Sequence, residues 1–143
     1  MPKKLDQLLD TFDMFPDPAD RTGMLLSYSD QFREVPSEIA TRPFPADHQV
    51  PQCESDAYVW AVKRPDSTLQ LYFAVENPSG VSARALAAIL DRTLSGRPAS
   101  EIAQVSTDIV ERIFRQNISM GKGMGLMSMV QAVQALAKMA LRE

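Results

Sequence analysis

Residues 57–76 read Ala-Tyr-Val-Trp-Ala-Val-Lys-Arg-Pro-Asp-Ser-Thr-Leu-Gln-Leu-Tyr-Phe-Ala-Val-Glu. Residues 57–63 are rich in β-branched and aromatic side chains, and residues 68–76 alternate strictly between an apolar and a mixed face. The Arg-Pro-Asp-Ser sequence at 64–67 is typical of a turn. The stretch therefore predicts an antiparallel β-hairpin. Because two strands are marginal alone, the apolar face of this hairpin must pack on helices.

Apolar residues at helical spacing flank the hairpin on both sides. Before it, Pro16 separates two such segments, and Asp17 followed by Pro18 is typical of a helix start. The pattern predicts helices over about residues 3–15, 18–32, 82–94, 107–116 and 124–141, with a short helix near Pro98. In the last helix the expected buried residues are Leu126, Met129, Val130, Val133, Leu136 and Leu141.

Residues 35–52 connect the first helices to the hairpin. Their prolines predict an extended, stiff segment, within which His48-Gln49-Val50 is expected to add a short edge strand. The order of elements then predicts an α+β fold, in which a small antiparallel sheet of about three strands is packed against and flanked by helices. A length of 143 residues suits a single domain over residues 1–143.

Composition excludes several classes of protein. A net charge of −3 without a cluster of Lys or Arg gives no electrostatic case for nucleic-acid binding. The N-terminus lacks the apolar run of a signal peptide, and no apolar stretch approaches the roughly 20 residues of a membrane span. A single cysteine fits a reducing compartment. We expect a soluble, cytoplasmic protein that binds neither nucleic acid nor membrane.

Cys53 is the only cysteine in the chain, so it makes no internal disulfide and is a poor metal ligand alone. Pro51 and Gln52 precede it and Glu54 follows it, which predicts a loop that enters the first strand. Loops on a rigid scaffold are where reactive groups tend to lie. The pattern favours a working thiol over a buried structural cysteine.

His48 is the only histidine. In an extended arm it would lie roughly 16 Å from Cys53, too far for a nucleophilic Cys-His pair. We expect His48 to be a surface residue. One Cys and one His do not make a metal site, so we expect no metal.

Residues 119–125 read Ser-Met-Gly-Lys-Gly-Met-Gly, and the first five of them, residues 119–123, predict a loop before the last helix. The sequence is not a phosphate-binding loop, since Gln116 stands where that pattern needs glycine and Gly123 stands where it needs Ser or Thr. One interpretation is a flexible turn between helices. In the other, free N–H groups and the positive charge of Lys122 stabilise a thiolate or persulfide anion, if Cys53 lies nearby. Met120 and Met124 are candidates for partner contact.

The sequence from Cys53 to Tyr58, with Trp60 beyond it, resembles the Cys-Gln-Ser-x-Val-Trp signature of the SufE family, the sulfur-acceptor partners of cysteine desulfurases. Residues 119–127 resemble the family's Ser-Arg-x-x-Gly-Leu stretch before the last helix, and the order of elements agrees along nearly the whole chain. The chain departs from the family where Gln52 replaces glycine, Glu54 replaces Gln and Lys122 matches the usual arginine.

The resemblance implies a SufE-like fold and a role in iron–sulfur cluster assembly. Cys53 would accept persulfide sulfur from a SufS-type cysteine desulfurase, stimulate that enzyme, and deliver the sulfur to a SufBCD-type scaffold. Pyridoxal phosphate would belong to the desulfurase, and this chain would need no cofactor and would not act as a stand-alone enzyme. The residues implied to support the transfer or contact the partner are Glu54, Ser55, Gly121, Lys122 and Gly123.

Two other functions remain open at this point. One is a thiol redox enzyme or sensor with a single cysteine, which would need glutathione or a second subunit because the chain has no resolving cysteine. The other is a binding module in which the cysteine is incidental. For a sulfur carrier we further expect Cys53 to fold back against apolar residues such as Tyr58, Met120 or Met124.

Overall fold

The computed structural model describes residues 2–53 and 55–143. Strands β1 (Ala57–Lys63) and β2 (Leu69–Val75) pair antiparallel, with Ala57 opposite Val75 and Lys63 opposite Leu69. The turn between them is closed by the Arg64 amide, which donates to the Thr68 carbonyl at 2.8 Å, and by Ser67 in the left-handed region at φ 69°. The predicted hairpin is confirmed.

The helices of the described residues confirm the α+β class and follow the predicted order. Asp17 is the N-cap expected for the second helix, because its carboxylate accepts from the Ala19 amide at 2.8 Å. The helices are α1 (Lys3–Asp13), α2 (Pro18–Asp30), α3 (Val81–Leu94), α4 (Ala99–Ile102), α5 (Asp108–Phe114) and α6 (Met120–Leu141), with 3₁₀ turns η1 (Ala46–His48) and η2 (Arg115–Asn117).

Within the described residues the sheet has two strands, so the expectation of about three was wrong. The predicted edge strand at residues 48–50 is reduced to one isolated bridge between Gln49 and Tyr58, and the residues before it form η1. Pro45 and Pro51 lack amide donors and bracket this short stretch, which limits its pairing to a single bridge.

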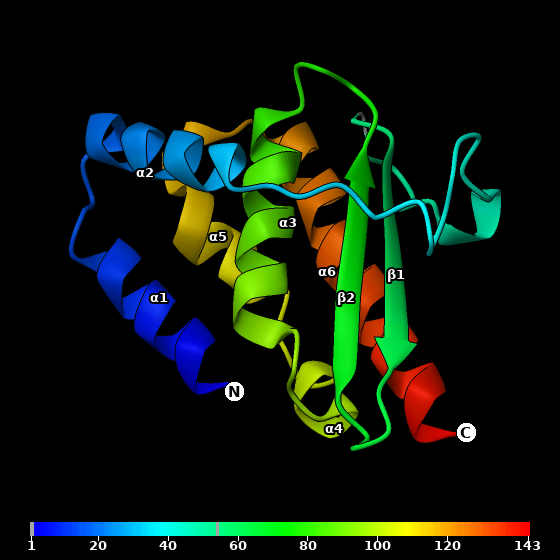
Figure 1. Ribbon diagram of the computed structural model, residues 1–143. Helices are drawn as coiled ribbons and strands as arrows, with labels where there is room; N and C mark the ends of the chain where they lie inside the picture. The colour runs from blue at the N-terminus through cyan, green and yellow to red at the C-terminus, as the bar shows by residue number, and fades with distance from the viewer. Residues whose placement is uncertain (1, 54) are drawn as a thin grey trace.

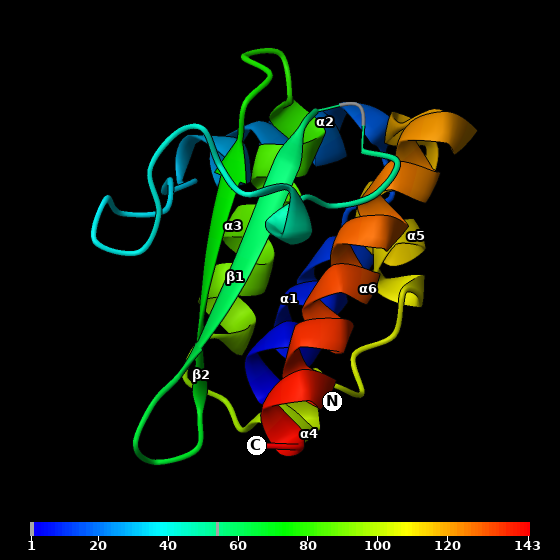
Figure 2. The same cartoon turned by 90° about the vertical axis from the view of Figure 1, so that its right-hand side faces the viewer.

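The helices cover one face of the hairpin. Strand β2 packs on α3 and strand β1 packs on α6, while α1, α2 and α5 lie on the far side of α3 (Figure 1). The start of β1, the β2–α3 turn and the start of α6 lie at one end of the molecule (Figures 1 and 2). Helix α1 begins and helix α6 ends at the opposite end (Figures 1 and 2).

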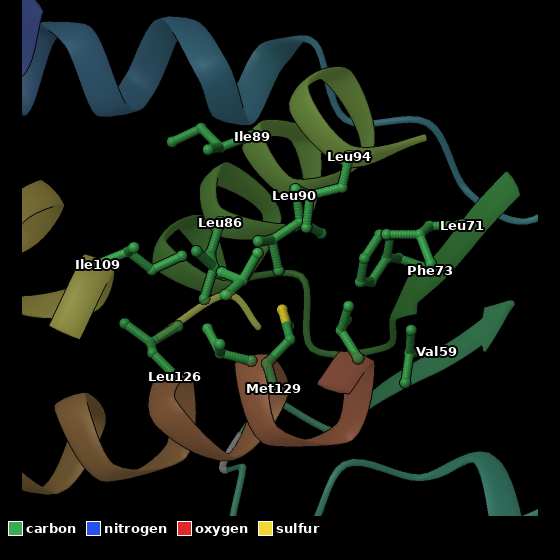
Figure 3. Close-up of a cluster of buried hydrophobic side chains, with 14 of the residues drawn as sticks. Val59, Leu71, Phe73, Leu86, Ile89, Leu90, Leu94, Ile109, Leu126 and Met129 are labelled. Atoms are coloured by element: carbon green, nitrogen blue, oxygen red, sulfur yellow. The ribbon is translucent and has the colours of Figure 1, made fainter. Parts of the chain in front are cut away.

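The main core lies between the hairpin and the helices. Phe73 of β2 points toward α3, where it meets Leu90, and Met129 reaches the same space from α6 (Figure 3). All three side chains are at most 2% exposed. The alternation predicted for β2 is therefore confirmed, since its buried inner face consists of Leu69, Leu71, Phe73 and Val75.

Helix α6 differs from its prediction at its last turns. Leu136 is only half-buried and Leu141 is 55% exposed, whereas Ala137 and Ala140 are buried. A repeat of 3.6 residues carries the buried stripe through positions 133, 137 and 140 and turns Leu141 away. By length and composition alone α6 is also apolar enough to cross a membrane, which corrects the expectation that no such stretch exists; a buried core helix passes the same test.

The outer face of the hairpin is covered by the segment that precedes β1, which crosses the strands in both views (Figures 1 and 2). Val35, Trp60 and Ala74 are buried there and form a second, smaller cluster. The rings of Phe44 and Trp60 meet edge to face with centroids 5.4 Å apart. Both faces of the hairpin are thus covered without further strands.

The two edges of the hairpin are also occupied. Along β2, the Leu71 amide donates to Ser95 Oγ at 3.0 Å, and the Phe73 carbonyl accepts from the Val35 amide at 2.8 Å. Along β1, the Ala57 carbonyl accepts from the Val50 amide at 2.8 Å. These contacts satisfy backbone groups that a free edge would expose to pairing with another chain.

Arg21 is fully buried, and its charge is held by backbone carbonyl groups. The guanidinium donates to the carbonyls of Phe12 and Phe15 at the end of α1, and to those of Arg112 and Ile113 in α5. Helix C-termini carry partial negative charge, which favours a cation at this position. Burial lowers the pKa of Arg21, and the charge of Arg115 lowers it further.

Replacing Arg21 with Met should therefore destabilise the fold. The substitution removes the guanidinium hydrogen bonds to buried carbonyl groups near the ends of α1 and α5, so we expect the free energy of unfolding to fall by about 3 kcal/mol or more. Urea denaturation followed by circular dichroism measures this. The control is Arg33→Met, at an exposed position, with an expected change within about 0.5 kcal/mol. Equal stability of the two variants would contradict the role given to Arg21.

Candidate functional site

Cys53 lines a cavity of about 170 Å³ at the end of the molecule where β1, α3 and α6 begin. Ser55 shares the loop of Cys53, the wall opposite is the β2–α3 turn with the first residues of α3, and the remaining wall is the start of α6. A second, more open groove of about 550 Å³, formed by residues 46–53, also reaches Cys53. The thiol is half-buried and packs against the main core.

The residues on either side of Cys53 bend its loop sharply. Gln52 has φ 59° and Asp56 has φ 50°, both in the left-handed region that favours glycine. The Asp56 amide closes the turn by donating to the Cys53 carbonyl at 3.2 Å. A left-handed Gln52 costs about 1 kcal/mol more than glycine, which explains physically why glycine suits this position in chains with the Cys-Gln-Ser-x-Val-Trp signature.

The β2–α3 turn holds the loop from one side. The Glu76 amide donates to the Asp56 carbonyl and the Asn77 amide to the Ser55 carbonyl, both at 3.1 Å. Gly80 is buried against the loop, and a Cβ atom on it would lie 3.0 Å from Ser55 Oγ. Two backbone hydrogen bonds and the close packing of Gly80 therefore hold this turn against the loop.

Helix α6 holds the loop from the other side. Gly125 lies so close that a Cβ atom on it would be 3.0 Å from the Gln52 carbonyl oxygen and 3.3 Å from Cys53 Cα. Such distances are tighter than most contacts of a Cβ atom, so any other residue here would push the loop backbone away by a few tenths of an ångström. The thiol is thus carried by a loop clamped between α6 and the β2–α3 turn.

The start of α6 differs from the predicted loop over residues 119–123. The helix begins at Met120, with Ser119 as N-cap and Ser119 Oγ accepting from the Lys122 amide at 3.3 Å. Gly121 and Lys122 consequently lie in its first turn and line the cavity beside Cys53. Gly123 does not line the cavity; a Cβ atom on it would lie 3.5 Å from Ile118 Cδ1.

Two helix N-termini meet at the cavity. Val81, Ser82 and Ala83 of α3 line it, and among the described residues no side chain caps α3 at Gly80. First-turn N–H groups have no partner within a helix and carry partial positive charge. With the exposed Lys122 ammonium group added, this environment favours an anion next to Cys53.

His48, which was also considered as a candidate from the sequence, does not line the cavity. His48 is half-buried rather than on the surface, because its Nδ1 donates to the Val59 carbonyl at 2.9 Å and its ring stacks on Trp60. Glu54 lies outside the described residues. In residues 2–53 and 55–143 no group of three His, Cys, Asp or Glu side chains is placed to hold a metal ion.

The expected apolar cover of Cys53 comes from other residues than those predicted. Tyr58 packs in the outer cluster, Met120 is 86% exposed and Met124 is 51% exposed. Leu126 and Ala83, which are buried, line the cavity instead. Sequence reasoning also missed Gly125; its signal was a glycine inside an apolar helical repeat, which lowers helix stability and usually has a packing reason.

Comparisons with known proteins report on the family and the fold of the chain. Residues 6–137 match the family model SufE, described as Fe-S metabolism associated domain. A similar curated protein is SufE-like protein 1, chloroplastic/mitochondrial, of Arabidopsis thaliana, 27% identical over 96% of this chain; the chain spans 35% of that relative's length. The solution structure of a hypothetical protein from Thermus thermophilus superimposes with a TM-score of 0.77 at 23% identity, covering 100% of this chain and 99% of the other.

The close contact between Gly125 and the loop of Cys53 predicts opposite effects on stability for substitutions at two glycines of α6. Gly125→Ala forces the loop away from the helix, so we expect the free energy of unfolding to fall by about 1 kcal/mol and alkylation of Cys53 by iodoacetamide to accelerate. Gly121→Ala is the control, because among the described residues nothing beyond its chain neighbours and the nearby backbone of α6 lies within 4 Å of its Cβ position, and alanine favours helix by about 0.5 kcal/mol. If both substitutions stabilise the protein, the close approach is not a constraint.

Proposed function

The chain belongs to the SufE family of Fe-S metabolism associated domains, and on this premise we propose that it accepts sulfur on Cys53 and delivers it for iron–sulfur cluster assembly. One observation carries the proposal. The only cysteine of the chain borders a cavity on which two helix N-termini and Lys122 converge. This combination suits a group that must be nucleophilic and then bear a negatively charged sulfur.

The proposed step is transpersulfuration. The Cys53 thiolate attacks the terminal sulfur of a persulfide on the donor's cysteine, and a new S–S bond forms as the donor's S–S bond breaks. The electron pair of the broken bond leaves on the donor sulfur, which becomes a thiolate and takes up a proton. Cys53 then carries the persulfide, and no external oxidant or reductant is needed.

The cavity would hold the product of this step. A persulfide at Cys53 adds one sulfur atom, which the volume of about 170 Å³ easily accommodates. The N–H groups of the first turns of α3 and α6 favour its anionic form, and Leu126 and Ala83 provide an apolar wall. A carrier needs this partial shelter so that reductants in solution do not remove the sulfur before delivery.

The proposed donor is a SufS-type cysteine desulfurase, whose pyridoxal phosphate mobilises the sulfur, and the proposed recipient is a SufBCD-type scaffold. The chain itself would use no cofactor and would stimulate the desulfurase by accepting its sulfur. Exposed apolar residues near the cavity suit a docking face for such partners: Met120 is 86% exposed, Met124 51% and Val81 37%. A reducing, cytoplasmic setting would keep the lone thiol available.

Intact-mass measurement tests the transfer directly. After incubation with a cysteine desulfurase and free cysteine, we expect the wild-type protein to gain the mass of one or more sulfur atoms, removable by a reductant. Cys53→Ser should gain none. If the wild-type protein gains no sulfur and does not stimulate the desulfurase, the carrier function is wrong. Glutathione adducts on Cys53 in the same spectra would instead favour a single-cysteine redox protein.

A charge substitution tests the electrostatic part of the proposal. Lys122→Ala removes the ammonium group at the cavity, so we expect sulfur transfer to Cys53 to slow by about three- to tenfold at low salt, with the difference shrinking at high salt. Lys122→Arg keeps the charge and should transfer at nearly the wild-type rate. Lys138→Ala, an exposed change near the far end of α6, is the control. Unchanged transfer by Lys122→Ala would make Lys122 a solvated surface residue only.

A further inference from the structure

Arg84 binds the β2–α3 turn on the side away from the thiol loop. It lies in α3, and its half-buried guanidinium donates to three backbone carbonyls. Nη1 donates to Pro78 at 3.0 Å, and Nη2 donates to Asn77 at 2.9 Å and to Val75 at 3.3 Å. Arg84 forms no ion pair with a carboxylate of the described residues, so its hydrogen bonds are committed to this turn.

One peptide unit joins Arg84 to the loop of Cys53. The Val75 carbonyl and the Glu76 amide belong to the same planar, trans peptide group, so they point in opposite directions. The carbonyl accepts from Arg84, and the amide donates to the Asp56 carbonyl at 3.1 Å. Fixing one end of this peptide plane therefore fixes the direction of the hydrogen bond at the other end.

The neighbouring contacts lead to the same loop. The Asn77 carbonyl accepts from Arg84 and also from the Gly80 amide at 3.0 Å, while the Asn77 amide donates to the Ser55 carbonyl at 3.1 Å. Gly80 in turn lies against Ser55 Oγ. The turn thus has Arg84 on one side and the loop of Cys53 on the other, and the guanidinium sets its shape by charge-assisted hydrogen bonds.

We propose that Arg84 is a positioning residue for the Cys53 thiol. It does not line the cavity beside Cys53; it holds the peptide groups after β2 in the orientation that anchors the loop beside the two helix N-termini. Its effect on sulfur transfer rests on the proposed function. Its effect on the anchoring of the loop is a property of the isolated chain and can be measured without a partner.

The test compares Arg84→Met and Arg84→Lys with Arg92→Met. Arg92 is a matched control, since it lies later in α3 and its guanidinium donates to the exposed side chain of Gln31. Hydrogen exchange followed by NMR reports the Glu76 and Asn77 amides individually. For Arg84→Met we expect both to exchange about tenfold faster, while amides at the centre of the hairpin keep their rates. For Arg84→Lys, which retains a donor, we expect partial protection, and for Arg92→Met the wild-type rates.

A second measurement separates positioning from partner binding. In a desulfurase assay, Arg84→Met should lower the maximal stimulation, whereas the concentration that gives half of that maximum should stay within about twofold. Alkylation of Cys53 should accelerate about threefold or more. If Arg84→Met does not fold, Arg84→Lys carries the test, with exchange of the two amides as its readout.

The inference is overturned if the Glu76 and Asn77 amides exchange at wild-type rates in a folded Arg84 variant, or if Arg92→Met accelerates them equally. Failure of the proposed function looks different. The wild-type protein would then gain no sulfur, while the exchange and alkylation differences among these variants would persist.

Discussion

A hairpin of two strands has two faces and two edges, and a sheet of this size has no further strand to cover any of them. Here α3 and α6 cover the inner face, and the segment before β1 covers the outer face. The edges are satisfied by Ser95 and Val35 along β2 and by Val50 along β1. Since an isolated hairpin is marginal in water, the placement of α3, α6 and the segment before β1 follows from this requirement.

The same requirement positions the thiol. The segment that covers the outer face and the β1 edge must turn back to enter β1, and Cys53 lies in that turn. Helix α6, which is needed against β1, passes so close to the turn that a side chain at position 125 would displace it. The turn after β2 is equally close, with Gly80 against Ser55. The thiol is thereby held by backbone contacts, which tolerate little movement.

Sequence patterns predicted the parts of the fold that depend on local chemistry. Strand alternation, helical spacing and the Asp17 cap are short-range features, and the hairpin and helices match them closely. The patterns did not predict that α6 begins at Met120, because Gly121 and Gly123 are poor helix formers and hide the first turn. The contacts of Gly125 and of Arg84 also escaped prediction, since they depend on how separate segments meet in the folded chain. Cys53 was singled out because it is the only cysteine, and its role stays a prediction.

Cys53 lines the cavity between the starts of α3 and α6, whereas α1 begins and α6 ends at the opposite end of the molecule (Figures 1 and 2). A fused domain or a flexible tether attached at either terminus would therefore project away from the cavity beside Cys53. It would leave the mouth of this cavity sterically unobstructed. The fold can be incorporated as a module into larger polypeptides without rebuilding the surroundings of its cysteine.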